Sequence, residues 1–258
     1  MMIETNGVKL QVRDNGQGEL SLVFLHYWGG SSRTWHQTID ALPQRYRTIA
    51  IDHRGWGESE PGNGNYGIAD LAADAEGVIE SMGIQQYVLI GQSMGGKVAQ
   101  LMASRRPQGL VGLVLVAPAS PCASPIPLDQ RQFIAAAYAS RESILAACDQ
   151  VLTARALSPA IKEQVVEDSL RGSPDAKFAW PMKTILEDIT KDVARIRVPT
   201  LVIAGEFDQI DPVDTLKAQL LSRIHCATMC TLPGVGHLSP LEAPIEIARE
   251  IEQFIGHL

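Results

Sequence analysis

One serine of the sequence occupies a position where a side chain could act as a nucleophile. Residues 91–95 read Gly-Gln-Ser-Met-Gly, so that Ser93 is the centre of a G-x-S-x-G pattern between an apolar run and a helix-like segment. A serine at a tight strand-to-helix turn has a strained backbone and an exposed hydroxyl, and the flanking glycines let strand and helix approach closely. The pattern alone also occurs by chance in loops, but these surroundings favour a nucleophile.

Such a serine needs a base, because an uncharged hydroxyl is a weak nucleophile. Of the six histidines, His237 is the best candidate, since it lies among Gly234 and Gly236 in a loop that follows the strand-like residues 227–232. Loops after strands are where α/β sheets carry their sites. The segment Ser239 to Glu242 has the spacing of a capping box, which predicts a helix directly after a short, anchored loop.

The base in turn needs a carboxylate that fixes its tautomer and stabilises the imidazolium. Asp208 lies just past the carboxyl end of the strand-like residues 200–204, and it is our candidate for this acid. Glu206 and Asp211 are its rivals. Asp211 precedes Pro212, which is more typical of a helix N-cap, and Glu206 could equally be a solvated charge.

The elements that must position these three residues alternate between strand and helix. After residues 8–12, which alternate apolar and polar side chains, apolar strand-like runs cover residues 20–25, 48–51, 87–90, 113–116 and 200–204. Helix-like patterns cover residues 68–82 and 94–106. Continuous Val, Ile and Leu runs are typical of strands with helices on both faces. We therefore predict an α/β fold with an antiparallel entry into a mostly parallel central sheet, flanked by helices.

The alternation stops in the middle of the chain, where four prolines crowd one loop and Ala-rich helical segments follow. This pattern predicts a helical cap over residues 119–195, inserted between two parts of the core, 1–118 and 196–258.

These features resemble those of the α/β-hydrolase fold superfamily, in its carboxylesterase or haloperoxidase-like branch of serine hydrolases. Besides the serine motif, residues 52–59 are similar to the family's D-x-R-G-x-G-x-S turn and residues 205–212 to its G-x-x-D-x-x-x-P segment. The order Ser93, Asp208, His237 is the family's order of nucleophile, acid and base. The resemblance covers nearly the whole chain.

The resemblance implies an oxyanion hole made by the backbone N–H groups of Met94 and Trp28. Tyr27 stands where the family usually has glycine, so we expect its side chain to restrict the backbone that aims the Trp28 N–H. His26 is expected to have a structural role, and Lys97 to be a surface or cap-contacting charge. Substrate-binding side chains are expected from this loop and the cap: Tyr27, Trp28, Phe133, Tyr138 and Trp180.

The implied activity is hydrolysis of an ester-type bond in a small, largely apolar substrate through an acyl-enzyme on Ser93. The same three residues also serve carbon-carbon bond hydrolases, lactonases, cofactor-free haloperoxidases or perhydrolases, and small-molecule receptors of this fold, so these alternatives stay open. None of these routes requires a metal or a cofactor.

Composition excludes several other classes of function. The 258 residues carry 22 basic and 29 acidic side chains, a formal charge of −7, with no basic run, which argues against nucleic-acid binding. Four cysteines are too sparse for a disulfide scaffold, and none of them has the C-x-x-C spacing of zinc or redox sites. No apolar run reaches the roughly 20 residues of a membrane span and no signal peptide is apparent, so we expect a cytoplasmic protein with a small-molecule substrate. The sequence leaves the oligomeric state open.

Overall fold

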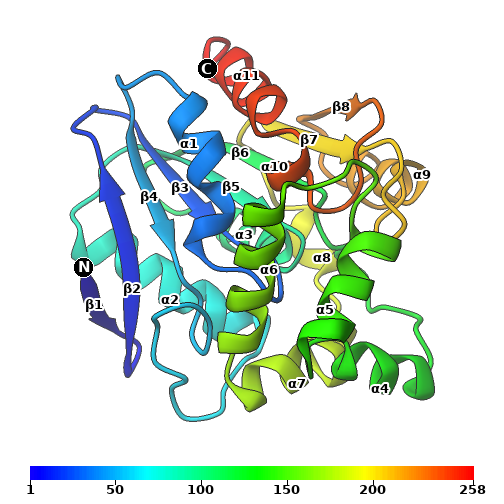
Figure 1. Ribbon diagram of the computed structural model, residues 1–258. Coiled ribbons are helices and arrows are strands. Elements are labelled where there is room, and N and C mark those ends of the chain that lie inside the picture. The colour runs from blue at the N-terminus through cyan, green and yellow to red at the C-terminus, as the bar shows by residue number, and fades with distance from the viewer.

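The centre of the molecule is an eight-stranded sheet, and the computed structural model describes all residues, 1–258. The strand order is β1-β2-β4-β3-β5-β6-β7-β8. The first two strands are antiparallel to their neighbours and the other six run parallel (Figure 1), so the predicted antiparallel entry into a mostly parallel sheet is confirmed. The strands are β1 (Met2–Thr5), β2 (Val8–Asn15), β3 (Ser21–Leu25), β4 (Arg47–Ile51), β5 (Tyr87–Gln92), β6 (Leu110–Val116), β7 (Thr200–Gly205) and β8 (Ala227–Leu232).

Both faces of the sheet are covered by helices, as the apolar strand runs require. Along β3, Val23 and Leu25 point into a large core that includes α2 (Ile68–Ser81) and α3 (Met94–Ser104). Leu22 and Phe24 point the other way, into a smaller core with α11 (Pro244–Ile255), beside which α1 (His36–Ala41) packs. The period of two along the strand thus divides one apolar run between two cores.

The predicted helix after residue 67 shows how the sequence sets its limits. The buried residues of α2 include Ile68, Leu71, Ala75 and Val78, which recur at helical spacing and face the sheet. The chain leaves the helix at Gly83, whose φ of +61° lies in the left-handed region that favours glycine. After this turn the chain enters β5, and Ser93 directly follows that strand.

Between β6 and β7 the chain forms helices and connecting loops only. Residues 117–199 are called the inserted segment below, and the helices within them the inserted helices. Three of these helices have an N-cap serine whose hydroxyl accepts a backbone N–H of the first helical turn, namely Ser140, Ser158 and Ser173. Figure 1 shows α4, α5 and α7 gathered at one side of the molecule. The inserted elements are α4 (Leu128–Ala136), α5 (Arg141–Ala147), η2 (Cys148–Leu152), α6 (Pro159–Arg171), α7 (Pro174–Met182), η3 (Thr184–Leu186) and α8 (Thr190–Val193).

The inserted helices are tied to the loop that follows β3. The Ser31 hydroxyl donates to the Asp168 carboxylate of α6 at 2.9 Å, and Arg33 pairs with the same carboxylate at 3.2 Å. The Ser169 hydroxyl donates to the Gly29 carbonyl at 3.0 Å. These bonds hold α6 against the loop that carries Tyr27 and Trp28.

The remaining elements are short helical turns that follow three of the strands. They are η1 (Ser32–Trp35) after β3, α9 (Val213–Leu216) and η4 (Lys217–Leu221) after β7, and α10 (Ser239–Glu242) after β8. None of the helices has both the length and the apolar composition that a membrane crossing requires.

Candidate active site

Ser93 lies at a sharp turn between β5 and α3. Its φ of +50° and ψ of −116° belong to the strained region that side chains other than glycine rarely adopt. A Cβ at Gly91 would lie 2.4 Å from the Gly95 carbonyl oxygen, and one at Gly95 would lie 2.6 Å from the His26 carbonyl oxygen. The two glycines of the motif are therefore required by close backbone approach, as the pattern predicted.

Three residues far apart in the sequence form one hydrogen-bonded chain. His237 Nε2 lies 2.9 Å from Ser93 Oγ, and His237 Nδ1 lies 2.9 Å from Asp208 Oδ2. All three side chains are buried. Because the carboxylate only accepts, it assigns the proton to Nδ1, and Nε2 is then free to accept the serine proton. The structure thus brings together the three residues predicted as nucleophile, base and acid.

The surroundings of His237 favour its charged form. Burial acts to lower its pKa, but the charge of Asp208, the hydrogen bond to it, and the charges of Asp211 and Glu242 together raise the pKa above the ordinary histidine value. An imidazolium formed by proton transfer from Ser93 is therefore stabilised where it arises.

Asp208 is held in place by the loop after β7. Its Oδ1 accepts the backbone N–H groups of Ile210 at 2.8 Å and Asp211 at 3.0 Å, which leaves Oδ2 for His237. Of its rivals, Glu206 accepts the Gly234 N–H at 2.8 Å on the surface side of the loop. Neither rival carboxylate is bonded to His237.

The loop that carries His237 is fixed by Glu242, although not through the predicted capping box. α10 begins at Ser239 itself, with Leu238 before it making no side-chain cap, and the Ser239 hydroxyl donates back to the Gly236 carbonyl. The Glu242 carboxylate accepts the Gly236 N–H at about 3 Å and two N–H groups of the inserted segment, those of Ala154 and Arg155, at 2.8 Å each. The capping-box prediction is therefore wrong in its partners, because the turn is too tight for Ser239 to precede the helix.

The backbone N–H of Trp28, the first candidate oxyanion donor, has no hydrogen-bond partner in the structure. His26 Nε2 accepts the His53 N–H at 3.0 Å, so its Nδ1 carries the proton and donates to the Tyr27 carbonyl at 2.7 Å. The Gly30 N–H donates to the same carbonyl, and no hydrogen bond uses the Trp28 N–H on the opposite side of that peptide plane. Burial lowers the pKa of His26, which keeps its ring neutral for these bonds. His26 thus has the expected structural role.

The second candidate donor is the Met94 N–H, in the first turn of α3. Backbone N–H groups of a first helical turn lack helical partners and attract negative charge. Tyr27, expected to disturb the other donor, does not have a positive φ, so its side chain causes no backbone strain there. The positive φ of this turn lies at Gly29, at +98°, a conformation that glycine adopts without strain, and a Cβ there would lie 2.3 Å from the Tyr138 ring. The turn therefore requires glycine at position 29 and not at position 27.

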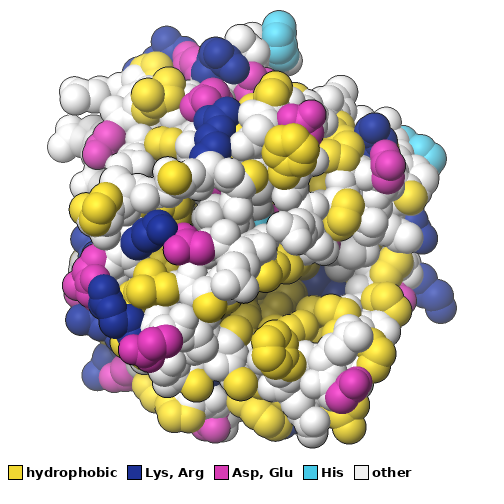
Figure 2. All heavy atoms as spheres, turned by 45° about the vertical axis from the view of Figure 1, so that its right-hand side comes forward, with side chains coloured by type: hydrophobic (Ala, Val, Ile, Leu, Met, Phe, Trp, Pro, Cys, Tyr) yellow, Lys and Arg dark blue, Asp and Glu magenta, His cyan; other side chains and the backbone are white.

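An apolar cavity of about 280 Å³ opens beside Ser93 and His237. Figure 2 shows a hollow with hydrophobic side chains on its walls, on the side where the inserted helices come forward. The Trp28 and Tyr138 rings pack with centroids 4.1 Å apart, and the Tyr138 hydroxyl donates to the Trp28 carbonyl at 3.0 Å. All the side chains expected to bind substrate line this cavity: Tyr27, Trp28, Phe133, Tyr138 and Trp180.

A second, more polar cavity of about 540 Å³ also reaches Ser93. Two of its charged residues had expected roles from the sequence. Lys97, expected to be a surface or cap-contacting charge, has the second of these roles: it is only 1% exposed, and its ammonium donates to the carbonyls of Cys122 at 3.1 Å and Glu187 at 2.6 Å in the inserted segment. Asp211 is not a helix N-cap, since Pro212 holds that position, and its carboxyl is buried at the cavity instead.

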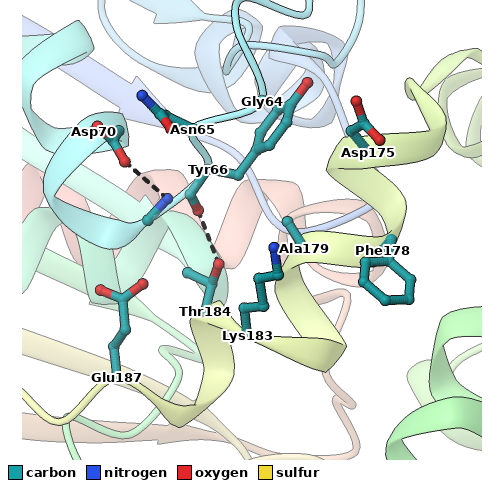
Figure 3. Close-up of a pocket in the computed structure, with 11 residues that line it drawn as sticks. Gly64, Asn65, Tyr66, Asp70, Asp175, Phe178, Ala179, Lys183, Thr184 and Glu187 are labelled. Atoms are coloured by element: carbon teal, nitrogen blue, oxygen red, sulfur yellow. Dashed lines mark hydrogen bonds between the residues drawn. The ribbon is translucent and has the colours of Figure 1, made fainter.

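A third cavity, of about 450 Å³, lies where α2 meets the inserted helices, and no residue of the hydrogen-bonded chain lines it. Figure 3 shows Asp70 and Glu187 on one side of this cavity and Asp175 on the other, with Asp70 bound to the Gly67 N–H. Glu187 accepts the Ile68 N–H with both oxygens at 3.2 and 3.3 Å. Both carboxylates therefore serve the first turn of α2, and we assign no chemistry to this cavity.

Comparisons with known proteins place relatives of this chain among hydrolases and haloperoxidases. Over its whole length the chain is similar to the AB hydrolase superfamily protein YisY of Bacillus subtilis (28% identity over 257 residues; 96% of this chain and 95% of that protein). It is also similar to a putative non-heme chloroperoxidase of Synechocystis (28% identity; 89% and 88% covered). Among solved structures, a thermophilic esterase from Thermogutta terrifontis superposes with a TM-score of 0.87 at 26% identity and covers 100% of this chain and 98% of its own.

The family assignment extends over both parts of the core. The sequence model of the alpha/beta hydrolase family matches residues 22–250, which include the serine turn, the loop after β7 and the His237 loop. The chain therefore belongs to the alpha/beta hydrolase family, in its esterase and haloperoxidase branch.

Proposed function

We propose that the protein is a serine hydrolase that cleaves an ester-type bond of a small, largely apolar substrate. The observation that carries the proposal is the buried chain Ser93–His237–Asp208, in which both contacts measure 2.9 Å. Proton transfer by a positioned histidine requires this hydrogen-bond reach, and the carboxylate behind it sets the tautomer.

In the proposed reaction, His237 Nε2 takes the Ser93 proton while Oγ bonds to the carbonyl carbon. The resulting oxyanion accepts the N–H groups of Met94 and Trp28. His237 then gives its proton to the leaving alcohol oxygen as the carbon–oxygen bond breaks, which leaves an acyl group on Ser93. A water molecule, deprotonated by the same nitrogen, attacks the acyl carbonyl and regenerates the serine.

The Trp28 donor depends on His26, since that ring fixes the peptide plane from its far side. Removal of one preorganised oxyanion donor lowers turnover by about 10² to 10³-fold in other serine hydrolases. We therefore assign to His26 the role of a positioning residue rather than a catalytic one.

Substrate selection is proposed to lie with the inserted segment, as a cap over residues 119–195. This segment supplies Phe133, Tyr138 and Trp180 to the apolar cavity, opposite Tyr27 and Trp28 of the core. Two arginines of this segment have partners outside the apolar cavity: Arg131 donates to the Met182 carbonyl, and Arg141 pairs with Glu163. An uncharged, apolar group fits such a cavity.

The proposal is tested by labelling with a fluorophosphonate and by hydrolysis of a short nitrophenyl ester. We expect the wild-type protein to be labelled and active, and Ser93→Ala to lose both properties. Ser104→Ala is the matched control, because Ser104 is a buried serine of the same helix whose hydroxyl only donates to the Leu101 carbonyl. Labelling of Ser93→Ala, or its unchanged turnover, would refute the proposal.

The similarity to a putative chloroperoxidase favours one second candidate, perhydrolysis. Hydrogen peroxide in place of water would attack the acyl group on Ser93, releasing a peracid and the free serine. Peracid formation from an ester and peroxide, faster than ester hydrolysis and lost in Ser93→Ala, would favour this candidate over the first.

A further inference from the structure

The two cavities that meet at Ser93 differ in their chemistry. They share Ser93 with four apolar side chains, Ile126, Trp180, Ile185 and Ile210. Beyond this common strip, one cavity is lined almost entirely by aromatic and aliphatic groups. The other contains most of the polar groups, namely Lys97, Ser120, Ser124, Asp211, Thr215 and Gln219.

The position of His237 decides which half of an ester enters each cavity. His237 lines the apolar cavity and not the polar one, and the same holds for Trp28. The leaving alcohol must take its proton from His237 Nε2, so the alcohol half lies on the apolar side. The acyl half then extends from Ser93 into the polar cavity.

Asp211 gives this cavity a carboxyl group that no cation neutralises. Its side chain is 8% exposed and forms no ion pair, and its own backbone N–H is bonded to Asp208. Burial raises its pKa to about 7, against the lowering effects of His237, the Ser120 N–H and Lys97. Near neutral pH the group is thus present both as a carboxylate and as an acid, and either form can bind a hydroxyl.

Lys97 adds a hydrogen-bond donor of opposite charge. Two of the three ammonium protons go to the carbonyls of Cys122 and Glu187, which leaves one for the cavity. A singly charged ligand would meet a like charge at either Lys97 or Asp211. A hydroxyl group accepts from the first and donates to the second without carrying a charge of its own.

We propose that the polar cavity binds a hydroxylated acyl group and that Asp211 determines this specificity. The inference rests on the proposed function and deepens it, since it names the two halves of the substrate: an apolar alcohol and a hydroxylated acid. Thr215 and Gln219 are further polar groups of this cavity, and its volume of about 540 Å³ accommodates an acyl chain of several carbons with a terminal hydroxyl.

The experiment compares benzyl esters that share one apolar alcohol and differ only at the end of the acyl chain. Benzyl 3-hydroxypropanoate and benzyl 6-hydroxyhexanoate are each paired with the ester that has a methyl group in place of the hydroxyl, benzyl butanoate and benzyl heptanoate. The benzyl ester of β-alanine and monobenzyl succinate supply an ammonium and a carboxylate. The measured quantity is kcat/KM for each ester.

We expect at least one hydroxyl ester to exceed its methyl partner by about tenfold, the effect of one net hydrogen bond. Asp211→Val should abolish this preference, whereas Asp211→Asn, which keeps the shape and an acceptor, should retain most of it. Asp214→Val is the matched control, because Asp214 is almost fully exposed in α9 and lies outside the cavity; its preference should equal that of the wild type.

Three results would overturn the inference: a methyl ester preferred at both lengths, a charged ester preferred over the hydroxyl esters, or an unchanged preference in Asp211→Val. A failure of the proposed function is separable. If no ester is hydrolysed, calorimetric binding of the same uncleaved esters to Ser93→Ala tests the cavity alone. Tighter binding of the hydroxyl ester supports the inference, and equal or weaker binding overturns it.

Discussion

Replacement of Lys97 by methionine should change how the stability of the protein depends on pH. Lys97 is 1% exposed. Burial lowers its pKa from 10.5 to about 8, although the charges of Glu187, Asp188, Asp211 and Cys122 oppose this effect. The folded state therefore holds its proton less tightly than the unfolded state does.

The size of the effect follows from proton linkage. Below about pH 8 both states are protonated and the folded state bears the full cost of the buried charge, about 3 kcal/mol at about 1.4 kcal/mol per pKa unit. Between the two pKa values the unfolded state binds more protons, so stability rises with pH. About 2.5 kcal/mol of that cost is removed between neutral pH and about pH 10.

The assay is urea unfolding of the wild type and of Lys97→Met near pH 7 and near pH 10. The free energy of unfolding of the wild type, relative to the variant, should increase by about 2 to 3 kcal/mol at the higher pH. Methionine also removes the two hydrogen bonds to Cys122 and Glu187, but it does so at both pH values. Their contribution therefore cancels when the free energies of unfolding at the two pH values are compared. Lys217→Met serves as the control, because its side chain is 57% exposed. The reasoning would be refuted if the difference in free energy of unfolding between the wild type and Lys97→Met stayed constant or fell as the pH rose.

Three further predictions concern the site. Asp208→Asn should lower kcat by about 10⁴-fold with little change in KM, because an amide at this position favours the wrong His237 tautomer; steady-state kinetics check this. The acid limb of kcat/KM should have its midpoint above the ordinary histidine pKa, since His237 must be deprotonated to act and its pKa is raised. Asp211→Asn should move that limb to lower pH, because the charge of Asp211 contributes to the raised pKa of His237. Gly95→Ala should destabilise the protein by about 1 to 3 kcal/mol or more, measured by thermal unfolding, because the added Cβ would lie 2.6 Å from the carbonyl oxygens of Leu25 and His26.

The strands and the reactive serine were predictable because their signals are local. The turn at Ser93 needs glycine on both sides, and the parallel strands need continuous apolar runs, so both leave marks within a few residues. Asp208 and His237 were predictable for a different reason: they follow strands, and parallel strands end at one edge of the sheet.

The burial of Lys97 and the role of Asp211 were not predictable, because both depend on distant parts of the chain. A lysine in a helix is usually exposed, and only the carbonyls of Cys122 and Glu187 make its burial tolerable. An aspartate before proline is usually an N-cap, and only the position of the polar cavity reveals another role. The requirement for glycine at position 29 likewise depends on the Tyr138 ring, more than 100 positions away, which leaves no room for a Cβ there.

The carboxylate of Glu242 has a consequence for substrate entry. It binds the loop of His237 and, through Ala154 and Arg155, the segment between η2 and α6. Widening the apolar cavity by moving that segment outward must either break these bonds or draw His237 along with it. The position of that segment and the position of the base are thereby coupled through a single carboxylate.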